Sequence, residues 1–285
     1  MAKQLSITII TPNLNGGKYL EDCIVSLKSQ EYKNLRHIII DGGSTDNSKN
    51  IAERYNVEFY LKLGLNNYEA IHFGFTNYRA DVFGWLNSDD LLRPGALHSI
   101  NEVFTNYTCI NWVSGIPTIS DNLGRIFIGQ YFSYPPYSKY SQLLNSKNYI
   151  QQESTFWRSK IYFKVGGLST NLIYANDYDL WRKLFDTEKL YHIPIVLASF
   201  REHSVHQISK SNKDKYENEA RQSLVNSTRK YKFRNITKIF IFLDLVLIKI
   251  PVVGRLYVQT RFREKYLSFP AEIKVLEDKK FYLNT

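Results

Sequence analysis

Short apolar runs alternate with amphipathic segments over the first 120 residues of the chain. In one amphipathic segment, Leu20, Ile24 and Leu27 recur at helical spacing. The apolar runs are short and rich in β-branched residues, which predicts strands. The predicted strands cover residues 6–12, 37–41, 57–63, 81–87 and 109–115, and helices are expected within 13–30, after 44–46, and over 68–78 and 94–104. Strands that alternate with helices predict βαβ units and a mostly parallel sheet.

The pattern changes after about residue 125. A Tyr- and Ser-rich segment with a Pro pair predicts one or two strands and then a long irregular loop. Further along, the pattern predicts a strand over 153–158, a helix over 176–185 and a strand over 193–203. These elements extend the α/β pattern and add a second, less regular half to it.

Residues 235–266 are densely apolar but are interrupted by Lys238, Asp244, Lys249 and Pro251. The uninterrupted apolar runs are too short to span a bilayer. Four basic residues lie in or just beyond the last run, namely Arg255, Arg261, Arg263 and Lys265. This arrangement favours a basic amphipathic segment that lies on a membrane surface. The alternative is a terminal helix docked on the core of the domain.

Composition adds the expected class of partner. The chain has 285 residues, of which 44% are apolar, and its net charge is +10. A basic protein favours an anionic partner, which could be nucleic acid, anionic lipid or a phosphorylated substrate. No nucleic-acid-binding motif is visible. Two distant cysteines, Cys23 and Cys109, and the lack of a signal-peptide pattern favour a reducing, cytoplasmic compartment.

Polar segments follow three of the predicted strands, at residues 11–15, 41–46 and 86–90. In parallel α/β sheets, ligands bind at the carboxyl ends of the strands. The sequence therefore predicts that the acids in these segments, Asp41, Asp89 and Asp90, lie on one rim.

The adjacent carboxylates of Asp89 and Asp90 suit a hard divalent cation such as Mg²⁺ or Mn²⁺, which would offset their repulsion and bridge a diphosphate. The alternative is an Asp cap for the helix that follows. Asp41 precedes Gly42 and Gly43, so it could accept hydrogen bonds from a base or ribose while the glycines let the ligand approach the backbone. The alternative there is a simple turn closed by the Asp side chain.

Two further groups are candidates for chemistry. Asp177 and Asp179 open the predicted helix 176–185, and residues two apart face different ways on a helix. Only one of the two is expected to point into a cleft, where it could act as a general base. Trp181 lies on the same face of the helix as Asp177. The alternative is that both acids match the helix dipole. His203 and His206 follow a predicted strand, and one of them could complete a metal shell; the alternative is an ordinary surface histidine.

Six segments, taken in their order along the chain, resemble family 2 glycosyltransferases of the GT-A type. They are residues 7–15, 37–48, 83–97, 151–168, 174–184 and 197–203. No single segment is decisive, but six in the right order and spacing are highly specific, and together they cover roughly residues 5–206. The chain most resembles bacterial transferases that build O-antigen, capsule or other surface polysaccharide.

The resemblance implies an inverting transfer from a nucleotide diphosphate sugar, with a UDP-sugar as the family's usual donor. Asp177 matches the base that deprotonates the acceptor hydroxyl. The metal ion, Mn²⁺ or Mg²⁺, would be held by Asp89, Asp90 and His203. The residues expected to contact the donor are Thr11, Pro12, Asn13, Asp41, Gly43, Asn87, Ser88 and Asp89, and Asn87 stands where many relatives carry another Asp. Those expected near the acceptor are Gln152, Glu153 and Trp181.

One segment departs from the family pattern. Relatives usually carry Asp-x-Gly-x-Tyr-Asp-Ala-x-Asn between the third and fourth strands, next to the donor. Here Gly64 and Asn66 replace the first Asp and the Gly, Glu69 replaces the second Asp, and His72 replaces the Asn. This departure leaves the identity of the donor sugar open. It also leaves open whether the domain is catalytically active.

The resemblance implies a Rossmann-like GT-A domain over residues 1–206, with a nucleotide-sugar half (1–120) and an acceptor half (121–206). Residues 207–285 are expected to form a helical, basic amphipathic extension at the inner face of a bacterial plasma membrane, near an acceptor on a polyprenyl diphosphate. Two alternatives stay open. One is a degenerate domain that binds nucleotide sugar or lipid, and the other is a sugar nucleotidyltransferase, although residues 11–19 make a poor phosphate loop.

Overall fold

A seven-stranded sheet runs through the centre of the computed structural model, which describes residues 4–116, 118–127, 150–169, 171–193, 195–203 and 212–226, with 246, 267–268 and 282–283. Its strands are β1 (Ile7–Asn13), β2 (Leu35–Asp41), β3 (Glu58–Leu61), β4 (Val82–Trp85), β6 (Trp112–Ser114), β9 (Thr155–Arg158) and β10 (Tyr191–His192). Their order across the sheet is β10–β6–β9–β4–β1–β2–β3. Only β9 is antiparallel, to both β4 and β6. The predicted mostly parallel sheet is confirmed.

A second, smaller sheet lies beside the first and joins segments far apart in the sequence. Its strands are β5 (Leu91–Leu92), β7 (Ile119–Ser120), β8 (Ile126–Phe127) and β11 (Ala198–Arg201), in the order β5–β11–β7–β8. The sequence predicted a strand over 193–203, and within that range the described residues form only the shorter β11; β10 ends just before it, at His192. Because β5 pairs with β11, the segment after β4 lies against residues 198–203.

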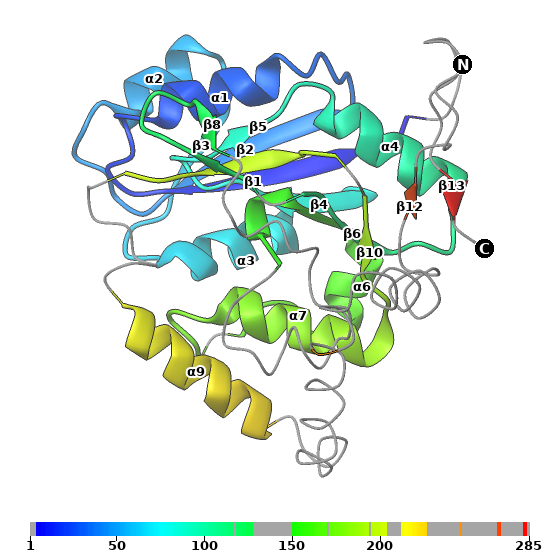
Figure 1. Ribbon diagram of the computed structural model, residues 1–285. Helices are drawn as coiled ribbons and strands as arrows, with labels where there is room; N and C mark the ends of the chain where they lie inside the picture. The colour runs from blue at the N-terminus through cyan, green and yellow to red at the C-terminus, as the bar shows by residue number, and fades with distance from the viewer. Residues whose placement is uncertain are drawn as a thin grey trace.

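Helices cover both faces of the central sheet (Figure 1). They are α1 (Leu20–Lys28), α2 (Ser48–Arg54), α3 (Asn67–Asn77), α4 (Ala96–Asn106), α6 (Ser159–Lys164), α7 (Asn176–Thr187) and α9 (Lys213–Asn226), with one 3₁₀ turn, η1 (Gln152–Ser154). Figure 1 shows α1 and α2 above the sheet and α3, α6 and α7 below it. The helices predicted from the pattern in this part of the chain are therefore present.

Alternation along β1 explains the two layers. Successive side chains of a strand point to opposite faces. Ile7 and Ile9 pack with α1 and α4, whereas Ile10 packs with α3. The α3 side also holds an aromatic cluster in which the Trp85 ring stacks on Trp181 at a centroid distance of 5.8 Å. This dense core gives the strand ends a rigid support.

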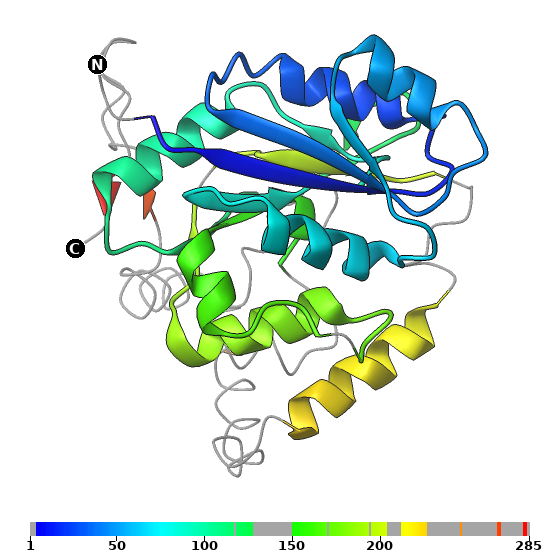
Figure 2. The same ribbon diagram turned by 180° about the vertical axis from the view of Figure 1, so that it is seen from behind.

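Helix α9 belongs to the region that the sequence assigned to a C-terminal extension, yet it packs on the α7 side of the core. Ala220 is buried in the same cluster as the aromatic residues of α3 and α7. Figures 1 and 2 both show α9 alongside α7, away from α1 and α2. The body of the protein thus continues beyond residue 206, at least to the end of α9.

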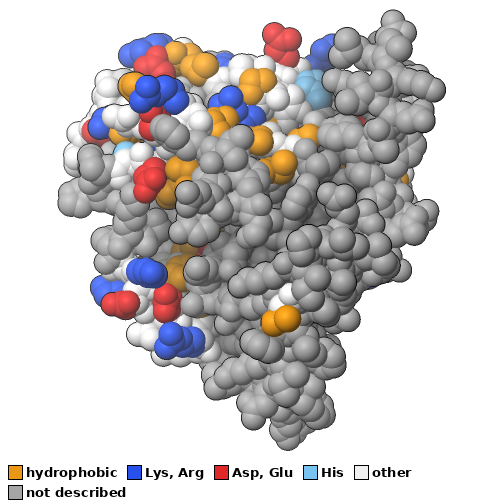
Figure 3. All heavy atoms as spheres, in the orientation of Figure 1, with side chains coloured by type: hydrophobic (Ala, Val, Ile, Leu, Met, Phe, Trp, Pro, Cys, Tyr) orange, Lys and Arg blue, Asp and Glu red, His pale blue; other side chains and the backbone are white. Residues whose placement is uncertain are grey.

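The predicted membrane segment, residues 235–266, lies outside the described residues except for Val246, so its role stays a prediction. Within the described ranges, no helix combines the length and the apolarity needed to cross a bilayer. Residues 227–285 carry 13 Lys and Arg against five Asp and Glu, which accounts for most of the net charge. On the described surface in Figure 3, basic and acidic side chains are interspersed.

Candidate active site

Three polar segments leave the central sheet at one edge. The parallel register of β1 and β2 places Asn13 opposite Asp41. Strand β4 pairs with the other side of β1, and the backbone N–H of Leu86 continues this pairing with a 3.0 Å bond to the carbonyl of Ile10. Residues 13–17, 41–46 and 86–90 therefore start from the same rim, as the strand order predicted.

Asp41 closes the turn after β2. The carboxylate is 1% exposed. One oxygen accepts from the backbone N–H groups of Gly43 (3.0 Å) and Ser44 (2.7 Å). The other accepts from the Ser44 hydroxyl (2.6 Å) and Asn13 Nδ2 (2.7 Å). Burial by itself raises the pKa of Asp41, but these hydrogen bonds outweigh it and hold the pKa below its ordinary value. Asp41 is thus ionised and shapes the rim.

The loop after β1 is fastened to the loop after β2. The backbone N–H of Asn15 donates to the Ser44 hydroxyl at 2.7 Å, and the N–H of Gly17 donates to Asp46 at 2.8 Å. A Cβ on Gly16 would lie 2.2 Å from Asn13 Oδ1 and 2.6 Å from Ser88 Oγ. A side chain at position 16 would therefore have to displace Asn13 or Ser88, both of which lie close to this backbone.

Three other predicted donor residues have different surroundings. Thr11 is fully buried, and its hydroxyl bonds to His37 Nε2 at 2.9 Å beneath the rim. Pro12 is buried as well. Gly43 has a φ of +116°, which an L side chain rarely adopts, and it lies in the turn held by Asp41. Thr11 therefore supports the rim from inside, whereas Gly43 forms part of its edge.

Asn87 links the end of β4 to the turn at η1. Its Nδ2 donates to Gln152 Oε1 at 3.2 Å and to Asp90 Oδ2 at 3.3 Å. Gln152 Nε2 in turn donates to the Trp85 carbonyl at 2.6 Å. The Asn87 Oδ1 atom is buried and has no hydrogen-bond partner. An amide at this position can bond both neighbours, which a further carboxylate could not do.

Asp90 points into the protein rather than outward. It is 0% exposed, and its Oδ1 accepts from the backbone N–H of Arg201 at 2.9 Å. Burial, and then the nearby Glu153 and Asp89, raises the pKa of Asp90 well above its ordinary value. Arg201 is itself buried and forms an ion pair with Asp22 at 2.8 Å. Asp90 thus fastens the rim to β11 with both of its oxygens engaged.

Asp89, unlike Asp90, is partly exposed: its side chain is 28% exposed, and it pairs with His203, whose side chain is 8% exposed. His203 Nε2 lies 2.9 Å from Asp89 Oδ2. The His203 ring packs against Tyr19 with their centroids 4.8 Å apart. The pairing of β5 with β11 brings these two residues together across 114 positions of sequence.

A divalent cation fits the Asp89–His203 pair by its chemistry. A carboxylate oxygen and an imidazole nitrogen are ordinary ligands for Mn²⁺ and related ions, whereas Mg²⁺ prefers oxygen alone. Among the described residues, no group of three or more His, Cys, Asp or Glu side chains is arranged to hold a metal. Asp89 and His203 are thus two candidate ligands, and a diphosphate could fill other positions.

Glu153 is a buried acid between the two candidate centres. It is 4% exposed, and its Oε1 has no hydrogen-bond partner. Burial, together with the charges of Asp89 and Asp177, raises the pKa of Glu153 to about 8. The charges of both acids therefore reach Glu153.

Asp177 is the second residue of α7 and is 8% exposed. Its Oδ1 accepts from the N–H of Tyr178 at 2.7 Å and from the Tyr68 hydroxyl at 3.3 Å. Its Oδ2 accepts from the Tyr216 hydroxyl at 3.5 Å. Burial raises the pKa of Asp177 to about 6, although these hydrogen bonds lower it in part. Asp177 is therefore a carboxylate that can take up a proton near neutral pH.

The segment that departs from the family pattern builds the start of α3. The Asn66 side chain accepts from the N–H of Glu69 at 3.0 Å, and the Glu69 carboxylate accepts from the N–H of Asn66 at 2.8 Å. This is a capping box. It orients Tyr68 toward Asp177, while His72 Nδ1 lies 2.8 Å from the Tyr162 hydroxyl. Asn66 and Glu69 thus begin α3, and His72 joins that helix to α6.

Trp181 does not reach the rim. It is 1% exposed and lies in the aromatic core, where it stacks on Trp112 at 5.5 Å as well as on Trp85. Sequence reasoning placed it on the face of Asp177 but could not distinguish the cleft from the core. Tyr68 and Arg201 were not predicted from the sequence. For Tyr68 a signal was present, because the Asn-x-x-Glu pattern of Asn66 and Glu69 marks a capping box at the start of α3.

Comparison of the sequence with known proteins identifies the family of the chain. The sequence model of the family named Glycosyl transferase family 2 matches residues 8–167. A glycosyltransferase of Rickettsia typhi is 28% identical over 211 residues, which are 69% of this chain and 64% of that protein. One from Rickettsia conorii is 27% identical over 70% of this chain and 34% of its own length. The chain thus spans a third to two thirds of these relatives.

One further sequence relative and two solved structures extend the comparison. Chondroitin synthase of Escherichia coli is 25% identical over 82% of this chain and 35% of that protein. The structure of S. aureus TarS 1–349 with UDP-GlcNAc has a TM-score of 0.63 at 15% identity, covering 91% of this chain and 75% of that one. Glucosyl-3-phosphoglycerate synthase of Mycobacterium tuberculosis, with Mn²⁺ and UDP, gives 0.58 at 13%, covering 78% and 79%. The predicted GT-A fold is confirmed.

Proposed function

Because this chain belongs to glycosyl transferase family 2, we propose that it moves a sugar from a nucleotide diphosphate sugar to a hydroxyl of a saccharide acceptor, with inversion at the anomeric carbon. One observation carries the proposal. Short contacts join the rim to Asp177: the N–H of Gly64 donates to the Gly42 carbonyl at 3.1 Å, and the hydroxyl of Tyr68, at the start of α3, lies 3.3 Å from Asp177 Oδ1. The rim, which carries a group suited to a cation, and Asp177, which is suited to a proton, are therefore neighbours. An inverting transfer needs one of each.

A UDP-sugar is the proposed donor. The structures of S. aureus TarS with UDP-GlcNAc and of the mycobacterial synthase with UDP support this choice by their likeness in fold. The nucleoside would lie on the edge formed by Asn13, Asp41 and Gly43. There the fixed turn presents backbone groups, and the glycine leaves room for close approach. The diphosphate would reach toward Asn87, Ser88 and Asp89.

Asp89 and His203 are the proposed metal ligands, with Mn²⁺ preferred because one ligand is an imidazole nitrogen. When bound, the cation would stabilise the negative charge that develops on the departing diphosphate. Asp90 has a different role in this proposal. Since both of its oxygens accept hydrogen bonds within the protein, it holds the rim against β11 and so keeps Asp89 near His203.

Asp177 is the proposed base. The acceptor hydroxyl attacks the anomeric carbon, a new carbon–oxygen bond forms, and the bond from that carbon to the diphosphate oxygen breaks. The hydroxyl proton passes to the Asp177 carboxylate, and the nucleoside diphosphate leaves with the electron pair of the broken bond. With its pKa raised to about 6, Asp177 is ionised at neutral pH and is a stronger base than an exposed Asp.

The acceptor is proposed to be a saccharide of a surface polysaccharide, carried on a polyprenyl diphosphate at the cytoplasmic face of a bacterial membrane. Gln152 and Glu153 are the proposed contacts, and the free Oε1 of Glu153 suits a sugar hydroxyl. The resemblance of the sequence to chondroitin synthase supports a polysaccharide product. The basic apolar segment of residues 235–266 supports peripheral binding to the membrane.

The test is a calorimetric titration of the purified protein with UDP and a panel of UDP-sugars, in Mn²⁺, Mg²⁺ or EDTA. We expect binding in Mn²⁺ that weakens about tenfold or more in EDTA and in Asp89→Asn, because the diphosphate loses its cation. Asp186→Asn, a change of the same kind on α7, should bind as the unchanged protein does.

Binding of equal strength in EDTA would overturn the metal assignment, and no binding of any UDP nucleotide would overturn the donor. Binding without transfer to any saccharide or lipid-linked acceptor would favour the degenerate, non-catalytic domain instead.

A further inference from the structure

Helix α9 turns one face toward α7, and that face reaches the surroundings of Asp177. Tyr216, Glu219, Ala220 and Ser223 follow at intervals of three, one and three residues, which places them on one side of a helix. Ala220 is buried in the core. The other three each contact polar groups in α7 or just before it.

Glu219 holds the backbone that leads into α7. Its carboxylate accepts from three successive N–H groups, those of Ile173 (3.1 Å), Tyr174 (2.7 Å) and Ala175 (2.9 Å). Ala175 is the residue at the cap position of α7, and no side chain of that residue caps the helix. Glu219 therefore binds, from another helix, the N–H groups of the three residues that lead into α7. Its negative charge also suits the N-terminal end of the helix dipole.

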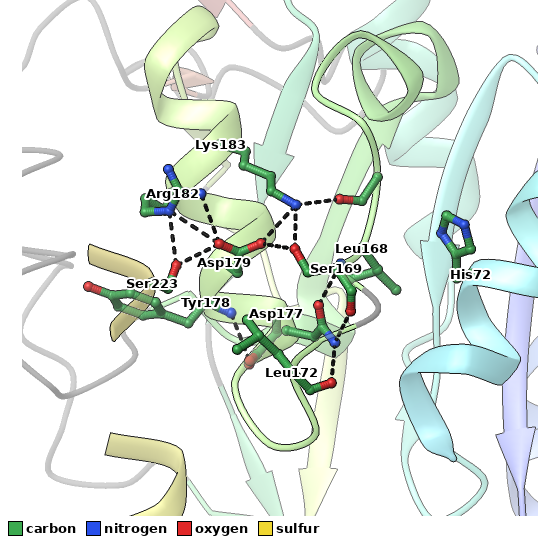
Figure 4. Close-up of polar contacts among 12 residues, drawn as sticks. His72, Leu168, Ser169, Leu172, Asp177, Tyr178, Asp179, Arg182, Lys183 and Ser223 are labelled. Carbon is green, nitrogen blue, oxygen red and sulfur yellow. Dashed lines mark hydrogen bonds and ion pairs between the residues drawn. The ribbon is translucent and has the colours of Figure 1, made fainter. Parts of the chain in front are cut away.

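Ser223 holds the first turn of α7 from the same side. Its hydroxyl donates to Asp179 Oδ1 at 2.5 Å and accepts from Arg182 Nε at 2.9 Å (Figure 4). The other Asp179 oxygen accepts from the Ser169 hydroxyl and pairs with Lys183 at 2.8 Å. Asp179 thus ties α7 to α9 and to the loop before α7. Of the two acids that open α7, Asp179 is therefore used in packing, and Asp177 is the one left for chemistry.

Tyr216 touches the carboxylate itself. Its hydroxyl lies 3.5 Å from Asp177 Oδ2, while Tyr68 of α3 lies 3.3 Å from Oδ1. The two phenols approach different oxygens of one carboxylate. A side chain held in this way has little freedom to change rotamer.

We propose that α9 is part of the active site, and that Glu219 and Tyr216 are positioning residues for Asp177. The inference rests on the role of Asp177 proposed above. Asp177 is only the second residue of α7, so whatever fixes the entry to that helix fixes the carboxylate. Glu219 fixes the residues before it, and Tyr216 fixes its Oδ2 from 39 residues away.

The first test compares Glu219→Gln with Glu217→Gln. The first change removes the charge and replaces one carboxylate oxygen with an NH₂ group. In the structure Oε2 accepts from all three N–H groups, and Oε1 accepts from that of Ile173 as well. The second is the same change on the same helix, at a carboxylate that pairs with Arg221 of α9. For Glu219→Gln we expect kcat to fall about tenfold or more, since small displacements of a reacting group are costly. The donor KM and UDP affinity should stay unchanged, because the donor edge does not involve α9. Glu217→Gln should keep full kcat.

The second test is the pH profile of Tyr216→Phe. Among the described residues, Tyr68 of α3 and Tyr216 of α9 contact the Asp177 carboxylate, the charge of Asp177 reaches Glu153 of η1, and Glu219 of α9 binds the backbone two residues before Asp177. Phe keeps the packing but removes a hydrogen bond that favours the ionised carboxylate, so the pKa of Asp177 should rise. We expect the acid limb of kcat/KM to move to higher pH. Tyr55→Phe, which loses a hydroxyl bond to Glu21 elsewhere, should leave the limb in place.

The outcomes separate the two proposals. If Asp177→Asn is inactive but Glu219→Gln and Tyr216→Phe keep the unchanged kcat and pH profile, the inference about α9 is wrong and the proposed function stands. If Asp177→Asn keeps its turnover, both are wrong. Should Glu219→Gln fail to fold, Tyr216→Phe still decides, because its ring preserves the packing.

Discussion

Replacing Asp177 with Asn should stabilise the protein while removing its proposed chemistry. Asp177 is buried, and its pKa rises from 3.8 to about 6. An acid whose folded-state pKa is raised binds its proton more tightly in the folded state. The contribution of this tighter proton binding to the free energy of unfolding is fully present below about pH 4 and is lost as the pH rises through 6. At neutral pH the folded protein therefore holds a charge that the unfolded chain would hold at lower cost.

The structure gives a magnitude for this cost. A rise from 3.8 to about 6, at about 1.36 kcal/mol for each pKa unit, corresponds to about 3 kcal/mol at pH 7.5. At pH 5 the carboxyl is mostly protonated in the folded state, and the cost falls to roughly half. Asn keeps an acceptor for the N–H of Tyr178 and carries no charge, so it should recover much of this free energy.

The assay is urea unfolding of both proteins at pH 7.5 and pH 5, in EDTA and without nucleotide. We expect Asp177→Asn to be more stable by up to about 3 kcal/mol at pH 7.5, with the gain shrinking at pH 5. An equal or lower stability at pH 7.5, or a gain that does not change with pH, would refute the reasoning that burial raises the pKa of this carboxyl.

Three further predictions follow from the rim and the base. Gly16→Ala should weaken UDP binding about tenfold by calorimetry, because its Cβ would displace Asn13 or Ser88; normal affinity would contradict the close approach. Asp41→Asn should cost roughly 1–3 kcal/mol in urea unfolding at pH 7. The difference should shrink as pH falls through the lowered pKa of Asp41, and a constant difference would count against it. The kcat/KM of the unchanged protein should fall about tenfold per unit below pH 6; a flat profile from pH 5 to 8 would contradict a base with the pKa of Asp177.

The sequence predicted the parts of the site that depend on local pattern. Short β-branched runs identified the strands, and the rule for parallel sheets placed Asp41 and Asp89 on one rim. The pairing of β5 with β11 was not predictable in this way. It joins Asp90 to Arg201 across 111 positions, and a two-residue strand leaves no periodic signal.

Side-chain surroundings were harder to predict than the elements. Trp181 and Asp177 share a helical face, but only the packing against Trp85 and Trp112 shows that Trp181 belongs to the core. Helix α9 is mostly polar, and its few apolar residues show only a weak helical periodicity. The sequence therefore suggested that it belongs to the basic extension of residues 207–285. The role of its polar residues depends on contacts with α7 that lie 39 or more positions away.

The central claim is that Asp177 takes the proton of the acceptor. The most direct measurement is kcat of Asp177→Asn against Asp186→Asn with the donor that binds best, together with UDP affinity in Mn²⁺. The account predicts that Asp177→Asn loses at least about a hundredfold in kcat while binding UDP normally, and that Asp186→Asn keeps both. Turnover of Asp177→Asn close to that of the unchanged protein would contradict the account.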